Sequence, residues 1–210
     1  MVQGIFSDFL RNLIIKKTFI IEDDGINLFK NIKYSALSSK SLAFLFQEIG
    51  KAASSSKDNN FKTYLYDLGY QAGEDAAKEM KENMLFKNKI FPYRARTLQL
   101  FMEMIGFGNC NFIDYNPKEK RILVHVSNHP VLLYSKELFG NDSMVCNYYL
   151  GVYTAHASNE LEITGARGIE TQCVCKGSPF CEWSFNYFKE NKSLDRIEKT
   201  KKKTNIKSKS

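Results

Sequence analysis

The sequence predicts an α+β fold in which an antiparallel sheet packs with helices. First, apolar residues recur at helical spacing in three segments between residues 38 and 105. Second, the spacing changes to simple alternation after Gly108, where residues 109–115 and 120–127 flank the turn at residues 116–119. Third, another alternating pair of segments follows near the end of the chain, around a Gly-Ser-Pro turn. Consecutive strands joined by such short turns pair antiparallel, so helices first and strand pairs later indicate an α+β domain.

The N-terminal part is predicted to contain a helix, a hairpin and a second helix. Residues 1–16 place apolar side chains at helical spacing, and this amphipathic helix is a candidate arm for a dimer. Residues 18–21 and 26–29 flank an Asp-Asp-Gly turn and are predicted to pair as strands. The Ser-Ser-Lys-Ser segment at residues 38–41 can cap a helix that ends near Gly50.

Two longer helices are predicted next, over residues 61–84 and 90–105. The first has a continuous apolar stripe that contains Gly69 and Gly73, each of which lowers helix propensity by about 1 kcal/mol relative to alanine. We expect this cost to be offset by the close approach of another helix or of a ligand. Pro92 is tolerated in the first turn of the second helix.

The region after the central hairpin is predicted to end in a strand, form one helix and start a new strand. The sequence Asn-His-Pro at residues 128–130 ends the strand. Ser143 is predicted to open a helix that continues to about Ala157 and carries Cys146. Residues 161–164 are expected to begin a strand that residues 165–168 interrupt.

Three of the five cysteines lie within nine residues near the C-terminus. Cys173, Cys175 and Cys181 flank the turn at residues 177–179, and this pattern is typical of a β-hairpin that carries thiols at its tip. Such a hairpin holds thiolates within a few ångströms, as a tetrahedral zinc site requires. Glu170 and Cys146 are further candidate ligands. An ideal strand would point Glu170 and Cys173 to opposite faces, so a bulge or twist is expected between them.

The role expected for the cysteines depends on whether the protein lies in a reducing compartment. The sequence shows no secretory signal and no apolar run long enough to span a bilayer, so we expect a cytoplasmic protein. Thiols in a reducing compartment are more often metal ligands or redox groups than disulfides, although inert core thiols or a disulfide remain as alternatives. Cys110, alone in a predicted strand, is expected to be a small core residue.

Positive charge is concentrated at the C-terminus. Residues 189–210 contain nine basic and three acidic residues, which gives +6 of the formal net charge of +7. This segment is also poor in aromatic residues and is predicted to be a disordered basic tail. Its expected role is to aid solubility, with weak contact to nucleic acid or anionic lipid as the alternative.

The C-terminal motifs resemble a known family. A helix containing Cys146-Asn-Tyr-Tyr-Leu-Gly, followed by Glu170-x-x-Cys173-x7-Cys181, is similar to the 4-vinyl reductase domain family. This family includes archaeal hydrocarbon-binding proteins and the sensor domains of phenol-responsive transcription activators. The resemblance is strong over residues 93–188, and the first half of the chain resembles the family through Leu-Gly-Tyr-Gln-Ala-Gly at residues 68–73. It implies a ligand-binding domain over residues 17–188.

The resemblance also implies a zinc ion held by Cys146, Glu170, Cys173 and Cys181. Three thiolates and one carboxylate complete a tetrahedron and leave no position for a substrate water, so the metal would be structural and would staple the C-terminal hairpin to the helix. Cys175 is the alternative to Glu170 as the fourth ligand.

The function that the resemblance implies is a sensor or carrier that binds a hydrophobic or aromatic small molecule between helices and sheet. His129, next to a proline at a strand end, is the predicted polar anchor for a hydroxyl or carboxylate of the ligand. His156 is interpreted as a favourable last-turn residue of its helix. The candidate pocket residues, for each of which plain core packing is the alternative, are Phe101, Phe107, Phe112, His125, His129, Tyr134, Tyr149, Tyr153 and Trp183.

Two other functions remain open at this point. One is an enzyme that reduces a vinyl group of a tetrapyrrole, the activity after which the family is named. The sequence favours it less, because it contains no Gly-rich nucleotide-binding motif and no recognisable catalytic set. The other is a protein-interaction module like the related subunits of vesicle-tethering complexes. We expect a homodimer, and a sensor without an output domain implies a separate signalling partner.

Overall fold

The computed structural model describes most of the chain. The described residues are 19–22, 25–28, 32–34, 37–55, 61–82, 91–116, 121–159, 161–163 and 165–187, with backbone alone up to residue 34. The predicted N-terminal helix at residues 1–16 and the predicted tail at residues 189–210 lie outside them.

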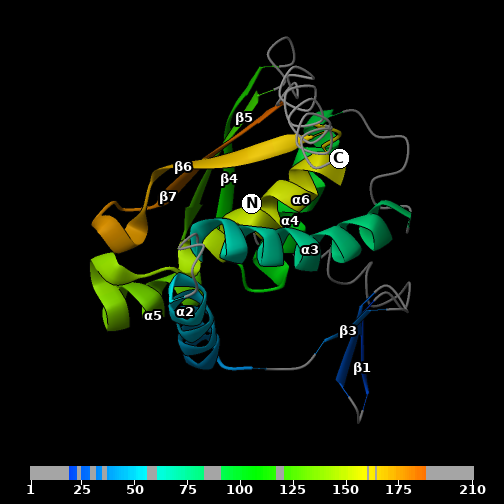
Figure 1. Cartoon of the computed structure of the whole chain (residues 1–210). Helices are drawn as coiled ribbons and strands as arrows, with labels where there is room; N and C mark the ends of the chain where they lie inside the picture. Colours follow the sequence, from blue (N-terminus) through cyan, green and yellow to red (C-terminus); the bar gives the residue numbers. More distant parts are fainter. Residues whose placement is uncertain are drawn as a thin grey trace, which may run out of the picture.

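Three short strands come first among the described elements, three helices follow, and the strands of the main sheet are then separated by further helices (Figure 1). The helices are α2 (Ser39–Ser54), α3 (Phe61–Glu82), α4 (Phe91–Met104), α5 (Pro130–Phe139) and α6 (Val145–Asn159), with short 3-10 turns η1 (Gly140–Asp142) and η2 (Val174–Lys176). The strands are β1 (Phe19–Glu22), β2 (Gly25–Leu28), β3 (Ile32–Tyr34), β4 (Asn109–Asn116), β5 (Arg121–Ser127), β6 (Ala166–Gln172) and β7 (Cys181–Tyr187).

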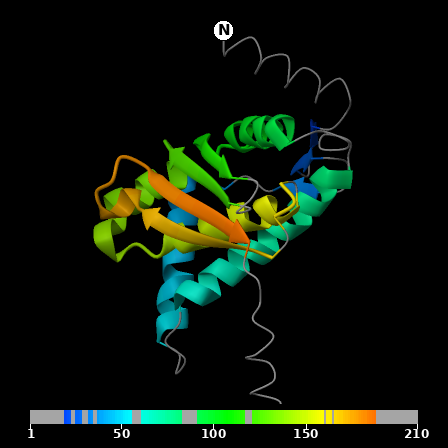
Figure 2. The same ribbon diagram turned by 90° about the horizontal axis from the view of Figure 1, so that it is seen from above.

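The main sheet has four strands in the order β4-β5-β7-β6, and every neighbouring pair is antiparallel. Strands β1, β2 and β3 form a second, small antiparallel sheet that lies apart from the main sheet, at the lower right of Figure 1. Helices α3, α4 and α6 lie beside the main sheet, as the view from above also shows (Figure 2). The predicted α+β class with an antiparallel sheet packed with helices is therefore confirmed.

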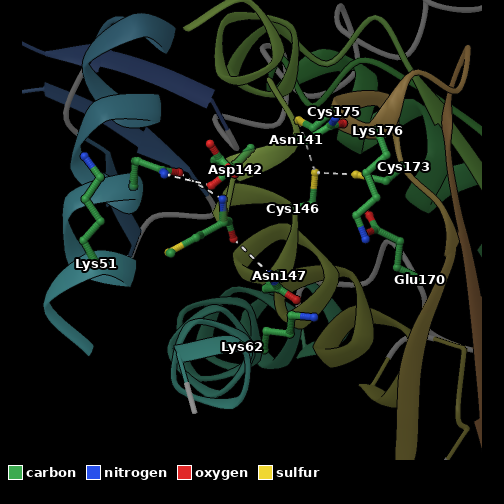
Figure 3. A pocket seen from close by; sticks show the side chains of 13 residues that line it. Lys51, Lys62, Asn141, Asp142, Cys146, Asn147, Glu170, Cys173, Cys175 and Lys176 are labelled. Atoms are coloured by element: carbon green, nitrogen blue, oxygen red, sulfur yellow. Dashed lines mark hydrogen bonds between the residues drawn. The ribbon is translucent and has the colours of Figure 1, made fainter. Parts of the chain in front are cut away.

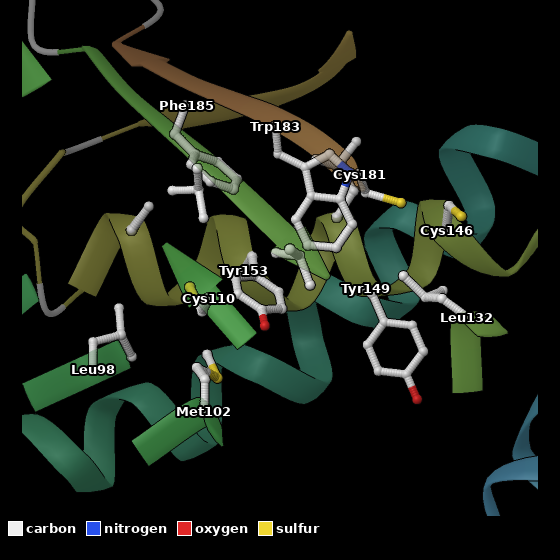
Figure 4. Close-up of a cluster of buried hydrophobic side chains, with 14 of the residues drawn as sticks. Leu98, Met102, Cys110, Leu132, Cys146, Tyr149, Tyr153, Cys181, Trp183 and Phe185 are labelled. Carbon is white, nitrogen blue, oxygen red and sulfur yellow. The ribbon is translucent and has the colours of Figure 1, made fainter. Parts of the chain in front are cut away.

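The core lies between one face of the main sheet and α6. Alternate residues of β5 and β7 are buried while their neighbours are partly exposed, which is the pattern of a sheet covered on one face. Trp183 and Phe185 of β7 point from the sheet toward Tyr149 and Tyr153 of α6 (Figure 4). Helix α6 is buried along most of its length, because the sheet lies on one side and α3 on the other.

Glycines let α3 and α6 approach each other closely. A Cβ atom on Gly69 would lie 1.9 Å from the carbonyl oxygen of Tyr148, and one on Gly151 would lie 2.0 Å from the carbonyl oxygen of Tyr66. At Gly73 the same atom would lie 2.8 Å from the carbonyl oxygen of Val152. The prediction that Gly69 and Gly73 are offset by close helix packing is confirmed.

Most predicted elements are present, but two predictions were wrong and two elements were missed. Residues 161–163, the described part of the strand predicted at 161–164, are not in a strand, and β6 begins at Ala166 and includes the predicted break around Gly168. The glycine at this position of the strand is explained by close packing against α6, because a Cβ atom on Gly168 would lie 2.4 Å from Oγ1 of Thr154. Helix α5 was missed because Pro130 was interpreted only as the end of a strand, although proline also favours the first turn of a helix. Strand β3 was also missed.

Candidate metal centre and ligand cavity

Four potential metal ligands from distant parts of the chain meet at one end of α6. Cys146 lies in the first turn of this helix, Glu170 lies on β6, Cys173 follows β6, and Cys181 opens β7. One ligand atom of each residue lies within 4.8 Å of those of the other three. Figure 3 shows the Cys146 and Cys173 sulfurs pointing toward each other, with Glu170 beside them. These are the four residues that the sequence resemblance named as a ligand set.

A β-bulge brings Glu170 and Cys173 to the same side. In the β6–β7 register Glu170 pairs with Trp183, and Gln172 pairs with the next residue back, Glu182, so Thr171 is an extra residue on β6. A bulge reverses the alternation of side chains beyond it. The prediction of a bulge or twist between Glu170 and Cys173 is confirmed.

Two of the four potential metal ligands are held in position by hydrogen bonds that they accept. The backbone N–H of Val174 donates to the sulfur of Cys181 at 3.3 Å, and the indole N–H of Trp183 donates to Oε1 of Glu170 at 3.1 Å. Groups of this kind around a metal ligand set its orientation. Gly177, at φ 94°, allows the chain to turn back from η2 into β7.

The N-terminus of α6, and with it Cys146, is held by a buried glutamine. The side chain of Gln47 on α2 donates to the carbonyl oxygen of Asp142 at 3.0 Å and accepts from the backbone N–H of Met144 at 2.9 Å. The hydroxyl of Ser143 accepts from the N–H of Val145 at 3.3 Å, as expected for the residue that opens the helix. Sequence reasoning did not find Gln47, since no local pattern marks a contact over so many residues.

Burial and mutual hydrogen bonds set the protonation of the cluster. Hydrogen bonds with the neighbouring thiols raise the pKa of Cys146 well above that of a free thiol, whereas such bonds lower that of Cys173. Burial raises the pKa of Glu170 to about 7. Without a cation, the cluster therefore retains most of its protons. A divalent ion would replace them, because thiolates and a carboxylate are its ligands.

The donor set fits zinc better than the hard cations. Sulfur ligands select zinc, iron–sulfur clusters or copper(I), whereas Mg²⁺ and Ca²⁺ require oxygen ligands. Cys146, Cys173 and Cys181 are at least 95% buried, and all five cysteines are free thiols. The sulfur of Cys175 lies 3.8 Å from that of Cys146, but it is outside the group of four whose atoms converge.

A polar pocket of about 470 Å³ opens beside the thiols (Figure 3). Its lining includes Lys51, Lys62 and Lys176 in addition to Cys146, Cys173, Cys175 and Glu170. The cluster is thus enclosed by protein on one side and reached from the pocket on the other.

A second cavity of about 200 Å³ lies along α6 from Tyr148 to His156, between this helix, α3 and α4. Tyr148 and His156 are the residues of its lining that have polar side-chain groups. Phe101, Val152 and His156 are buried, whereas Ala72 is exposed, so the cavity opens at α3. Its walls are Ala72, Gly73, Ala76, Phe101, Ile105, Phe107, Tyr148, Val152 and His156.

His129, the predicted polar anchor, is 2% exposed, and neither of its ring nitrogens has a hydrogen-bond partner among the described residues. Its ring lies 4.1 Å from that of Tyr149 and 5.4 Å from that of Phe107. Burial lowers the pKa of His129 to about 3, so the ring is neutral. His129 does not line the cavity, but Phe107 lines the cavity and also packs against His129.

The other predicted pocket residues divide between the core and the surface. Phe101 and Phe107 line the cavity, whereas Tyr149, Tyr153 and Trp183 are core residues. Tyr153 donates its hydroxyl proton to the carbonyl oxygen of Phe107 at 3.2 Å. The residues that the structure does not bring to the cavity are Phe112, which is partly buried against the core; Tyr134, which is 41% exposed; and His125, which lies 2.7 Å from Glu182 and stacks on Phe180.

Sequence reasoning missed the face of α6 that lines the cavity. Tyr148, Val152 and His156 are four residues apart and therefore lie on one face of the helix. His156 lies in the last turn of α6, as predicted, but the sequence did not indicate that it is 2% exposed and lines the cavity. The spacing of these three residues, set against the glycines of α3, was the signal available in the sequence.

No described helix is long and apolar enough to cross a membrane.

Comparisons with known proteins show the fold. The sequence matches no protein-family model and no curated protein. The phenol-responsive sensory domain of the transcription activator PoxR, solved with phenol, is similar with a TM-score of 0.64 and 14% identity, over 91% of this chain and 96% of that one.

Two further solved structures are more distant. A vinyl-4-reductase family protein from Methanocaldococcus jannaschii has a TM-score of 0.43 and 20% identity, over 77% of this chain and 87% of that one. A trafficking protein particle complex subunit 3 from Naegleria fowleri, covalently bound to palmitic acid, has a TM-score of 0.48 and 15% identity, over 72% and 95%. The fold is thus shared with a phenol-responsive sensory domain.

Proposed function

We propose that this chain is a small-molecule sensor or carrier domain whose ligand is hydrophobic or aromatic. The observation that carries the proposal is the apolar cavity between α3, α4 and α6. Its volume of about 200 Å³ is below the usual range for drug-sized ligands. An engineered apolar cavity of about 150 Å³ in another protein binds benzene. The cavity here therefore suits a single substituted ring.

The aromatic wall and the histidine define how such a ligand would bind. A ring between Phe101 and Phe107 would gain edge or stacking contacts, and a hydroxyl on it would face the imidazole of His156. His129 is the second candidate for a polar contact, because Phe107 packs against it and also lines the cavity, and its nitrogens have no partner among the described residues. The fold shared with a phenol-responsive sensory domain supports this ligand class.

The second part of the proposal is a structural zinc ion held by Cys146, Glu170, Cys173 and Cys181. When bound, zinc would supply a closed tetrahedral link between the start of α6 and the β6–β7 hairpin. The convergence of their ligand atoms supports this set. Because α6 also carries one wall of the cavity, occupancy of the cavity and the position of the hairpin would be coupled through this helix.

Mass spectrometry of organic extracts from the purified protein tests the ligand proposal, together with titration of the emptied protein with phenol and its methylated forms. We expect a hydrophobic or aromatic compound in the extract, or saturable binding of one of these probes. A Val152→Trp variant, which fills the cavity, should lose the binding. An Ile113→Trp variant at an exposed site on β4 is the matched control. Binding that survives Val152→Trp unchanged would place the ligand elsewhere.

We also propose a homodimer. Exposed apolar side chains support it, since Phe44 and Leu45 on α2 and Leu133 and Tyr134 on α5 are each more than 40% exposed, and the two helices pack together. Light scattering after size-exclusion chromatography tests the proposal by the mass of the particle, and a monomer at micromolar concentration would contradict it. A separate partner that receives the signal remains part of the sensor proposal.

A further inference from the structure

The thiol cluster contains one more sulfur than a tetrahedral metal site needs. Cys175 lies in η2, and its thiol donates to the carbonyl oxygen of Leu132 at 3.8 Å. Its sulfur lies 3.8 Å from that of Cys146, while the sulfurs of Cys146 and Cys173 lie 3.4 Å apart. If Cys146, Glu170, Cys173 and Cys181 hold the metal, Cys175 stays a thiol in contact with a metal-bound thiolate.

The polar pocket gives small reagents access to this pair of sulfurs. Cys146, Cys173 and Cys175 all line the pocket of about 470 Å³, whereas Cys181 is not in its lining and is 0% exposed. Gln47, Asn141 and Asn147 also line it, so the pocket suits a small polar molecule such as water or a peroxide. An oxidant would therefore reach these three sulfurs before Cys181, and of the three only Cys175 lies outside the group whose ligand atoms converge.

We propose that Cys175 is a redox-active thiol that forms a disulfide with Cys146 when a peroxide enters the pocket, and that this reaction releases the zinc ion. The proposal rests on the zinc site proposed above, but it concerns a thiol that this site does not use. It adds an oxidation site and a class of reactant, a hydroperoxide, to the sensor function.

The reaction balances in two steps. In the first, the Cys146 thiolate attacks one oxygen of hydrogen peroxide, the O–O bond breaks, and a sulfenic acid and hydroxide form. In the second, the sulfur of Cys175 attacks the sulfenic sulfur, the S–O bond breaks, and the thiol proton leaves with the oxygen as water. The two sulfurs lose two electrons, and peroxide is reduced to two molecules of water once the hydroxide is protonated.

The new bond changes what connects α6 to the hairpin. Cys146 would no longer be able to donate to the metal, which leaves Glu170, Cys173 and Cys181 as ligands and would weaken the binding of the ion. The disulfide instead joins the start of α6 to η2 and breaks the hydrogen bond from Cys175 to Leu132 on α5. Oxidation would thus alter the end of the helix whose far end lines the cavity.

Zinc release from the full-length, zinc-loaded protein tests the proposal. Hydrogen peroxide is added, released zinc is followed by the absorbance of a chromogenic chelator, and the disulfide is identified by peptide mass spectrometry. We expect wild type to release zinc with a Cys146–Cys175 disulfide. The Cys175→Ser variant should retain the wild-type zinc content but release zinc at least about tenfold more slowly, because its sulfenic acid has no resolving thiol. Cys110→Ala, a buried cysteine of β4, is the control and should behave as wild type.

The outcomes separate the redox role from the metal site. Equal release rates in wild type and Cys175→Ser, or a disulfide between Cys146 and Cys173, would overturn the redox role and leave the zinc site intact. Loss of zinc from untreated Cys175→Ser would make Cys175 a ligand and would also overturn it. A wild-type protein that binds no zinc would overturn both proposals.

Discussion

The two ends of helix α6 differ in the interactions that determine their structure. At the N-terminal end, donors from α6, β6 and β7 meet within 4.8 Å, and hydrogen bonds from Val174 and Trp183 fix their orientation. Toward the C-terminal end, the apolar faces of three helices leave a space of about 200 Å³. The first end depends on a few directional bonds, whereas the second depends on the shapes of many side chains. The thiol end should therefore be intolerant of single changes, and the cavity end tolerant of them.

The largest expected effect is at the thiol end. Removing zinc with a strong chelator, or replacing Cys146 by serine, should lower the free energy of unfolding by a substantial part of the roughly 10 kcal/mol that structural zinc contributes in zinc-finger peptides. Thermal denaturation of wild type with and without chelator measures this effect. Cys110→Ala should retain its response to the chelator, whereas Cys146→Ser should have lost it. A wild-type melting temperature that is unaffected by chelation would contradict the metal link.

The middle of α6, where α3 crosses it, should show the next largest effect. In a Gly69→Ala variant the new methyl group would lie 1.9 Å from the carbonyl oxygen of Tyr148, and the backbone must shift to admit it. Such overpacking should destabilise the protein by about 3 kcal/mol. Urea denaturation measures the loss, with Gly177→Ala as the control, because no atom lies near that position and only its positive φ is strained. An equal loss in the two variants would mean that helix contact is not the cause.

His129, packed against Tyr149 of α6, should make the core sensitive to acid. Its pKa of about 3 in the folded protein is below the value of an unfolded chain, so the unfolded state binds a proton first as the pH falls through 6.5. Stability contributed by neutral His129 is present above pH 6.5 and is lost toward pH 3. Between pH 6.5 and pH 5 the loss should be about 2 kcal/mol. His129→Phe should lose less stability over this interval, and an acid profile identical to wild type would refute the assignment.

The smallest expected effect concerns the polar group of the cavity. Replacing His156 by phenylalanine should weaken the binding of a phenol about tenfold, by removing one hydrogen bond worth about 1.4 kcal/mol. The affinity for a ring without a hydroxyl, such as toluene, should change little. Fluorescence or calorimetric titration of both probes measures the difference. If His129→Phe has the larger effect on phenol, the hydroxyl faces His129 behind Phe107 instead.

The same contrast explains what the sequence could predict. The alternation of residues 169–187 around three cysteines was enough to expect the hairpin. The set of four converging residues was implied by the resemblance to the 4-vinyl reductase domain family, and the need to bring Glu170 and Cys173 to one side then indicated the bulge. Gly69 and Gly73 correctly indicated close helix packing. In each case the informative residues lie within one short segment, and their spacing in that segment determines which of them share a face.

The cavity could not be predicted in the same way. Its wall is made where α3, α4 and α6 meet, so no single segment shows which aromatic side chain fills space and which borders it. His125 and His129 are four residues apart in the sequence, but one lies within β5 and pairs with Glu182, whereas the other follows the strand and is enclosed by aromatic rings. Helix α5 was missed because the same proline can end a strand or begin a helix.

The central claim is that a metal ion joins α6 to the β6–β7 hairpin through Cys146, Glu170, Cys173 and Cys181. X-ray absorption at the zinc edge of the purified protein tests it most directly. We predict three sulfur atoms at about 2.3 Å and one oxygen at about 2.0 Å from the metal. Four sulfur atoms would exclude Glu170 in favour of Cys175, and a shell of nitrogen and oxygen alone, or no zinc at all, would contradict the claim.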